Sequence, residues 1–156
     1  MQKITPFLWY DGQAEEAARF YVSIFKNSSI DRITHYSSAG PGEARSVMTV
    51  DFTLGGVSMT ALNGGPMYKF TEALSLSVAC EDQAELDRVW DALTDGGEPG
   101  PCGWLKDRYG VSWQVVPARM QALIGDPDPV VVKRAMEAMF KMSKLDIAAL
   151  EAARAG

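Results

Sequence analysis

The sequence predicts an α+β fold made of two βαβββ modules followed by a helical C-terminal extension. Residues 4–15, ITPFLWYDGQAE, resemble residues 74–85, LSLSVACEDQAE: each reads as a short strand, an acidic turn and a Gln-Ala-Glu triplet that opens a helix. The triplet Gly-Val-Ser at 56–58 recurs at 110–112, and each copy begins an apolar strand. Strand periodicity then stops after Pro117. A duplicated unit of this kind predicts a pseudo-symmetric sheet with a cavity between the copies.

The first module contains one amphipathic helix and the strands that follow it. Apolar residues recur at steps of three and four from Ala14 to Phe25, which predicts a helix. Asp11 is a candidate cap for the start of this helix, and Asn27 stands at its end. The strands expected after the helix span residues 30–37, 46–54 and 56–62.

The second module repeats this order. Leu86, Val89 and Leu93 form the apolar stripe of its helix, and Asp82 followed by Glu85 has the spacing of a capping box. Strands are expected over residues 103–109 and 111–117. A weaker strand is expected near residues 98–102, where two prolines remove backbone donors.

The tail reads as helical throughout. A short helix over 118–124 precedes the Asp-Pro-Asp-Pro turn at 126–129, and a methionine-rich helix over 130–142 follows. Ser143 is a candidate cap for a last helix that begins at Lys144. The predicted organisation is a duplicated core over 1–117, with modules at about 1–66 and 67–117, and an extension over 118–156.

Composition excludes several classes of partner. The chain has 156 residues, of which 47% are hydrophobic, so it can bury a sizeable core as one domain or two joined half-domains. Fifteen basic and twenty acidic residues give a net charge of −5 without a basic patch, which argues against nucleic acid and acidic membranes. No segment reaches the roughly 18 apolar residues of a membrane span. With Cys80 and Cys102 expected as reduced thiols, the sequence predicts a cytoplasmic protein.

Three long segments carry a resemblance to a known family. They are ITPFLWYDGQAEEAARFY, ALNGGPMYKFTEALSLSVACEDQAELDRVW and CGWLKDRYGVSWQVVP, and the DPDP turn with the helices after it fits as well. The chain resembles the PhnB-like branch of the vicinal oxygen chelate superfamily, which also contains glyoxalases, bleomycin-resistance proteins and extradiol dioxygenases. The branch carries the description 3-demethylubiquinone-9 3-methyltransferase. The resemblance implies the duplicated βαβββ fold and a homodimer.

The resemblance also raises the question of a metal. Metal-using relatives take a His or Glu ligand from the first and last strand of each module. The last-strand positions here hold Thr60 and Gln114, and the first-strand positions hold Thr5 or Pro6 and Ser75 or Leu76. Neutral hydroxyl and amide groups make a poor divalent site, so no metal ligand and no cofactor are expected. The single histidine, His35, lies away from these positions and is expected to be structural.

Strand alternation suggests what lines the cavity instead. If Gln114 points inward, strand alternation sends Ser112 and Val116 the same way, and the repeat adds Ser58, Thr60 and Leu62. Ser75, on the first strand of the second module, is a further candidate. This mixture suits an uncharged or weakly polar small molecule. The alternative is that these polar groups hydrogen-bond one another across a filled sheet face.

Two further candidates lie in the segment CGWLKD. Trp104 is placed to stack on a planar ligand. Cys102 is either a thiol activated by the nearby Lys106 or a small buried hydrophobe. Asp107 is expected to form a solvated pair with Lys106 in a turn.

The leading functional hypothesis is a metal-independent protein that binds a small molecule. The alternatives are a metal-dependent lyase, isomerase or dioxygenase, and a methyltransferase of quinone biosynthesis. The last needs a glycine-rich loop that opens a helix, whereas Gly64 and Gly65 lead into a linker and a strand.

Overall fold

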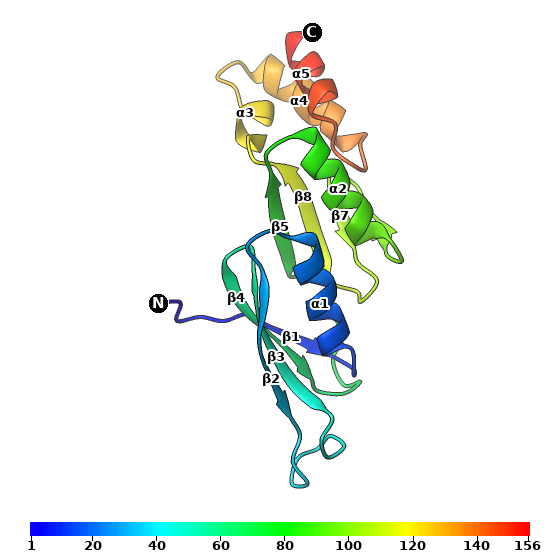
Figure 1. Cartoon of the computed structure of the whole chain (residues 1–156). Helices are drawn as coiled ribbons and strands as arrows, with labels where there is room; N and C mark the ends of the chain where they lie inside the picture. The colour runs from blue at the N-terminus through cyan, green and yellow to red at the C-terminus, as the bar shows by residue number, and fades with distance from the viewer. The chain divides into compact units, whose positions relative to one another are not determined.

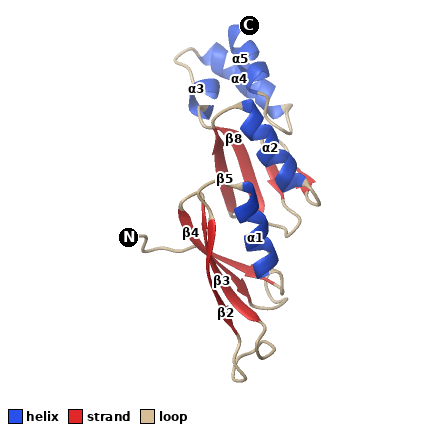
Figure 2. Cartoon of the chain, in the orientation of Figure 1, coloured by secondary structure: helices blue, strands red, loops and turns tan.

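The computed structural model describes all residues, Met1–Gly156, and divides them into two compact units, Met1–Phe70 and Thr71–Gly156. Each unit contains one four-stranded mixed sheet and the helix that follows its first strand (Figures 1 and 2). The α+β class predicted from the sequence is therefore confirmed. The elements of unit 1 are β1 (Phe7–Tyr10), α1 (Ala14–Ile24), β2 (Ser29–His35), β3 (Val47–Leu54) and β4 (Val57–Asn63).

In unit 1 the sheet has the order β1-β4-β3-β2, with β1 parallel to β4 and the other pairs antiparallel. Helix α1 packs against β3 and β4 (Figure 1). Its buried Tyr21 lies beside Phe52, and the hydroxyl groups of Tyr21 and Tyr10 are 3.1 Å apart. Alternate residues of the strands thus form the core with α1, and the others form the opposite face of the sheet.

Unit 2 repeats this arrangement with the order β5-β8-β7-β6. Helix α2 packs against β8 and β7, over the buried side chains of Leu105, Trp113 and Val115. Trp113 therefore faces the helix side, as strand alternation predicts. The elements of the repeated part are β5 (Ser75–Cys80), α2 (Gln83–Thr94), β6 (Glu98–Pro99), β7 (Trp104–Lys106) and β8 (Ser112–Pro117).

The tail belongs to the same compact unit as the second sheet. Its helices are α3 (Met120–Ile124), α4 (Pro129–Phe140) and α5 (Ile147–Ala155). Leu123, Ile147 and Leu150 form their common core, against which Ala138 and Met139 of α4 pack. No helix of the chain combines the length and hydropathy that a membrane crossing requires.

The strand registers show that the two sheets are copies of one pattern. Phe7 on β1 lies opposite Thr60 on β4, and Ser77 on β5 lies opposite Gln114 on β8. These are the pairs that the sequence repeat equates, since the first strands are offset by 70 positions and the last strands by 54. The next strand follows the same rule, because Asp51 on β3 opposes Thr60 and Trp104 on β7 opposes Gln114.

Two predicted helix caps are wrong. Asp11 does not cap α1; the amide N–H of Ala14 instead donates to Oδ1 of Asn63, at the end of β4 (2.8 Å). Ser143 does not cap the last helix, because its hydroxyl donates to the carbonyl of Gly100 and Asp146 is the cap. In both cases a group distant in the sequence replaces the local partner. The capping box at Asp82 is confirmed, since its carboxylate accepts from the Glu85 amide at 2.8 Å.

Candidate ligand-binding site

Four of the six candidate residues lie on one face of the second sheet. Trp104 is opposite Gln114 in the register, and Ser75 is opposite Ser112. Side chains of directly opposed residues project from the same face of a sheet. The Gln114 amide Nε2 donates to the Ser75 hydroxyl at 3.0 Å, so these two groups satisfy each other. The structure therefore brings these four residues together on the face away from α2.

A cavity of about 260 Å³ opens on this face. Trp104 and Ser112 border it, whereas Gln114 and Ser75 are not among its lining residues. Trp104 is half-buried, so part of its ring is open to a ligand. The remaining lining residues are Glu72, Glu98, Pro99, Gly100, Pro101, Leu105 and Lys106.

The charges at this cavity are partly compensated. Lys106 forms an ion pair with Glu72, and both side chains are substantially exposed. The hydrogen bond to Glu72 raises the pKa of Lys106, and the same bond lowers the pKa of Glu72. Glu98 adds a second carboxylate. The cavity thus carries two acidic groups and one basic group.

The turn before β7 sets the position of Trp104. Cys102 and Gly103 both have positive φ angles, +56° and +84°. A side chain at position 103 would lie 2.8 Å from the carbonyl of Val115, so only glycine fits there. The amides of Cys102 and Gly103 donate to the carbonyls of Met142 and Ser143 in the tail. The tail therefore holds the start of β7 in place.

The same turn directs Cys102 away from the cavity. Its Sγ atom lies 3.6 Å from the carbonyl oxygen of Met139, and Cys102 does not border the cavity. The structure therefore separates this candidate from Trp104, its near neighbour in the sequence.

The sixth candidate, Thr60, lies in unit 1 in a charged network that sequence reasoning missed. Its hydroxyl donates to Oδ1 of Asp51 at 2.8 Å, and Oδ2 of Asp51 accepts from the Arg32 guanidinium at 2.7 Å. Thr60 is 5% exposed. The signal available in the sequence was Asp51, the single charged residue of the β3 strand, at a position that alternates with Val50 and Phe52.

Asp107 is not the solvated partner of Lys106 that the sequence suggests. It is 3% exposed. Its Oδ1 accepts from the amides of Tyr109 and Val111, and its Oδ2 accepts from the indole Nε1 of Trp113 at 2.8 Å. Asp107 therefore closes the turn between β7 and β8 from inside the core, which ends β7 earlier than the sequence predicts.

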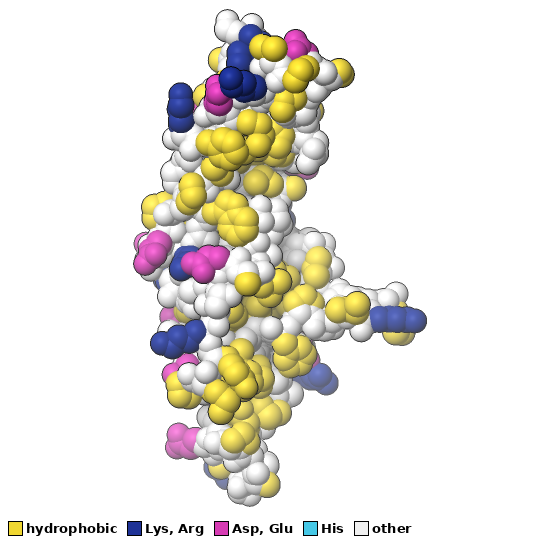
Figure 3. All heavy atoms as spheres, turned by 180° about the vertical axis from the view of Figure 1, so that it is seen from behind, with side chains coloured by type: hydrophobic (Ala, Val, Ile, Leu, Met, Phe, Trp, Pro, Cys, Tyr) yellow, Lys and Arg dark blue, Asp and Glu magenta, His cyan; other side chains and the backbone are white.

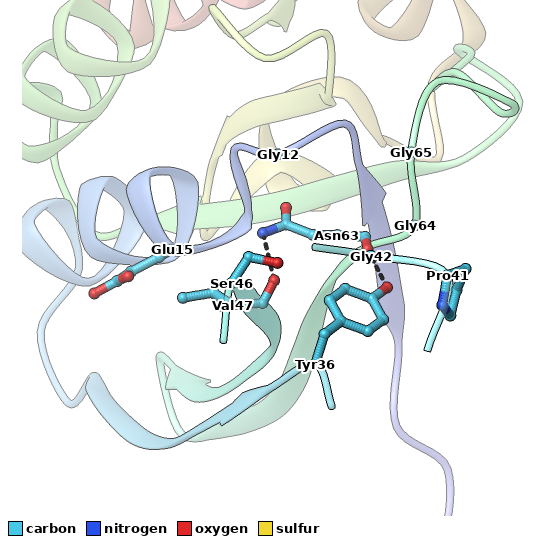
Figure 4. A pocket seen from close by; sticks show the side chains of 10 residues that line it. All are labelled: Gly12, Glu15, Tyr36, Pro41, Gly42, Ser46, Val47, Asn63, Gly64 and Gly65. Atoms are coloured by element: carbon cyan, nitrogen blue, oxygen red, sulfur yellow. Dashed lines mark hydrogen bonds between the residues drawn. The ribbon is translucent and has the colours of Figure 1, made fainter. Parts of the chain in front are cut away.

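A second cavity, of about 360 Å³, lies in unit 1 where β1 and β4 end (Figure 4). Asn63 holds the residues around it in place. Its side-chain Nδ2 donates to the carbonyl of Val47 at 3.1 Å, and its main-chain carbonyl accepts from the Tyr36 hydroxyl at 2.5 Å. None of the six candidate residues borders this cavity. Its lining residues are Gly12, Glu15, Tyr36, Pro41, Gly42, Ser46, Val47, Asn63, Gly64 and Gly65.

The side chains at the superfamily's metal-ligand positions do not fit a divalent ion. Register places Thr60 and Gln114 at equivalent positions of the two sheets, with Phe7 and Ser77 opposite them. These first-strand residues lie one or two positions beyond those expected from the sequence, 5 or 6 and 75 or 76, which hold no carboxylate or imidazole either. None of the four is a carboxylate or an imidazole, and Thr60 already donates its hydroxyl proton to Asp51. No group of three His, Cys, Asp or Glu side chains lies in a metal-binding arrangement.

Comparison with known proteins identifies the family. The model of the family described as 3-demethylubiquinone-9 3-methyltransferase matches residues 2–116. The PhnB protein of Bacillus cereus has a solved structure that is 39% identical, with a TM-score of 0.66 over 74% of this chain and 99% of that one. The chain belongs to the PhnB-like family of the vicinal oxygen chelate superfamily.

More distant structures share the fold of this PhnB-like chain. Protein PA1353 of Pseudomonas aeruginosa is 22% identical, with a TM-score of 0.62 over 75% of this chain and 97% of that one. The fosfomycin resistance protein FosX of Mesorhizobium loti is 13% identical, with a TM-score of 0.53 over 76% of this chain and 93% of that one. No curated protein matched in the corresponding comparison.

The family description alone does not support methyl transfer by this PhnB-like chain. Methyltransferases that use S-adenosylmethionine commonly bind it on a doubly wound parallel sheet, at a glycine-rich loop that opens a helix. Here each sheet has one parallel pair, and Gly64 and Gly65 follow β4 without opening a helix. The chain therefore does not have this common arrangement for binding S-adenosylmethionine.

Proposed function

We propose that this protein binds an uncharged or weakly polar small molecule at the face of the second sheet, without a metal ion. One observation carries the proposal: a cavity of about 260 Å³ opens beside the half-buried ring of Trp104, with a serine hydroxyl and two prolines among its walls. Ligand sites are concave and combine apolar walls with a few polar groups. Here Trp104, Leu105 and the two prolines supply the apolar part, beside Ser112 and the charged groups.

The indole ring of Trp104 supplies the main contact in this proposal. Stacking on an aromatic ring contributes roughly 0.5–1.5 kcal/mol beyond the area buried. We therefore expect Trp104→Ala to weaken binding about two- to tenfold and Trp104→Phe to retain most of the affinity. The experiment is a screen of neutral aromatic compounds by NMR, with the indole resonance of Trp104 as the reporter and affinities then measured for the three proteins.

Equal affinity of Trp104→Ala and the unaltered protein for every compound bound would reject this assignment. Trp104→Phe is the matched control, because it removes the indole N–H but keeps a planar ring over the cavity. A loss of affinity in Trp104→Ala alone supports stacking as the source of binding.

We also propose a homodimer and a cytoplasmic location. Phe7, Met67 and Tyr68 of unit 1 are each more than 60% exposed, and hydrophobic side chains lie at the surface in the view of Figure 3. Exposed hydrophobic side chains favour a partner surface, and light scattering measures the dimer directly. Both cysteines are free, and burial raises the pKa of Cys80 to about 11. Two free thiols suit a reducing compartment, which cell fractionation tests.

A further inference from the structure

One buried hydroxyl group in unit 2 has no hydrogen-bond partner. Ser112, on β8, is 1% exposed, and its Oγ atom forms no hydrogen bond. Buried hydroxyl groups are nearly always paired, because an unpaired one has lost its hydrogen bonds to water and gained none in return. This cost needs an explanation in the function of the site, and Ser112 borders the cavity that Trp104 also borders.

The neighbours of Ser112 on the sheet leave its hydroxyl available. Its register partners are Ser75 on β5 and Lys106 on β7. The Ser75 hydroxyl is already paired with Gln114, and the Lys106 ammonium is paired with Glu72. Neither neighbour therefore forms a hydrogen bond with the Ser112 hydroxyl, although both lie on the same face of the sheet.

The charges around this hydroxyl restrict what can bind to it. Glu72 and Glu98 outnumber Lys106 at the cavity, and Glu72 already occupies the ammonium group of Lys106. An anionic ligand would displace Glu72 from Lys106 and still face two carboxylates, so it is disfavoured. A neutral ligand avoids both effects.

The Lys106–Glu72 pair does not bar access to the cavity. The side chains of Lys106 and Glu72 are 41% and 61% exposed. Water screens the attraction between exposed charges, so this weak ion pair does not keep a neutral ligand out of the cavity.

We propose that Ser112 is the residue that determines ligand specificity at this site, donating its hydroxyl proton to a carbonyl-type acceptor on the edge of a planar ligand without negative charge. This inference rests on the proposed function and adds the ligand's chemistry: a ring that stacks on Trp104, a neutral acceptor that reaches Ser112, and no carboxylate or phosphate. A site of this kind selects amides, ketones or quinone-like rings over their acidic analogues.

The test uses two probes of almost the same shape, benzamide and benzoate, titrated into the full chain at neutral pH. Benzamide is neutral and benzoate is an anion, so their affinities differ through charge. We expect benzamide to shift the Trp104 indole and Ser112 amide resonances and to bind several-fold more tightly than benzoate. The double variant Glu72→Gln/Glu98→Gln should reduce the difference in affinity between benzamide and benzoate, because it removes both carboxylates from the cavity.

The variant Ser112→Ala separates a binding role from a structural one. It should weaken benzamide binding about two- to tenfold, the range of one net hydrogen bond. It should leave the melting temperature of the ligand-free protein equal or higher, because it removes an unpaired buried hydroxyl. Ser58→Ala is the matched control, since Ser58 is the equivalent residue of the first module and is exposed.

Each result decides between the two proposals. If benzamide shifts Trp104 but Ser112→Ala binds it equally well, or if benzoate binds more tightly, the role of Ser112 is rejected and binding at Trp104 stands. If Ser112→Ala lowers the melting temperature and leaves affinity unchanged, the hydroxyl is structural and this inference is rejected. If neither probe shifts the Trp104 resonance, both proposals fail.

Discussion

At the scale of single residues, Asp107 shows how much a local sequence can conceal. The segment LKDRYG reads as an exposed charged turn, because aspartate before a glycine usually caps a turn in water. The turn is present, but the carboxylate is buried and holds the indole of Trp113 from inside the core. The residue type thus predicted the turn, but only the structure shows that the Asp107 side chain points into the core and not into solvent.

We predict that Asp107→Asn destabilises the protein. An asparagine supplies one acceptor oxygen and places an amide donor against the amides or the indole that the carboxylate now accepts from. The expected loss of unfolding free energy is about 1–3 kcal/mol, the cost of an unpaired buried group. Urea denaturation followed by tryptophan fluorescence measures it.

The control for this variant is Asp95→Asn. Asp95 is exposed and pairs with Arg108 at 2.9 Å, so its loss should change stability by about 1 kcal/mol or less. Similar effects of the two substitutions would contradict the structural role of Asp107.

Strand alternation predicted the sheet face on which several candidate residues lie, but not the groups that they contact. Alternation along one strand was enough to put Gln114 and Ser112 on one face and Trp113 on the other. Alternation could not predict which groups meet across the cavity. The Lys106–Glu72 ion pair, for example, depends on the path of the linker before β5. Local periodicity fixes the direction of a side chain but not what meets it.

At the scale of elements, the two Gln-Ala-Glu triplets show the same sequence in different roles. Gln13 precedes α1 and forms no capping bond with its side chain. Gln83 opens α2, and its Nε2 donates to the carbonyl of Leu145 while its Oε1 accepts from the amide of Ile147. In the second module this side chain therefore joins the helix to the tail.

We predict that Gln83→Leu destabilises the chain and Gln13→Leu does not. Leucine fills a similar volume but leaves the Leu145 carbonyl and the Ile147 amide without their partner. The expected loss is about 1–3 kcal/mol for Gln83→Leu, against less than about 0.5 kcal/mol for the exposed Gln13. Chemical denaturation of both variants checks this, and an equal loss in the two would reject the asymmetry.

Helix ends were predictable only where the cap is local. The carboxylate of Asp82 reaches Glu85 within one turn, so the spacing alone identified it. The start of α1 is satisfied by Asn63, nearly fifty positions away, which no spacing rule covers. The same holds for Ser143, whose hydroxyl goes to Gly100.

At the scale of the whole molecule, duplication is the property that the sequence predicted best. Two strand offsets read from the repeat reproduce the parallel registers of β1 with β4 and of β5 with β8. Side chains on the opposite face have diverged, because packing against a helix constrains the core face more tightly than the open face. The open face thus holds an Arg32–Asp51–Thr60 network in one unit and Trp104 beside Gln114 in the other.

The division into a core over 1–117 and an extension over 118–156 remains a prediction from the repeat, and the bonds of the tail favour a different boundary. Cys102 and Gly103 donate their amide protons to tail carbonyls, and Gln83 binds the tail twice. Leu145 is fully buried in unit 2. The tail therefore completes the second unit, and we expect residues 71–156 to fold alone but residues 71–117 to remain unfolded.

Two purified fragments test this expectation by thermal unfolding and by the dispersion of amide NMR signals. The fragment over 71–156 keeps a core that includes Leu86, Trp113 and Leu145, and it should unfold cooperatively. The fragment over 71–117 loses the partners of Gln83 and of the turn before β7, and so short a chain has little core to compensate. Cooperative folding of the shorter fragment would make the tail a separable extension, as the sequence repeat suggests. Failure of both fragments would mean that unit 2 needs the first module to fold.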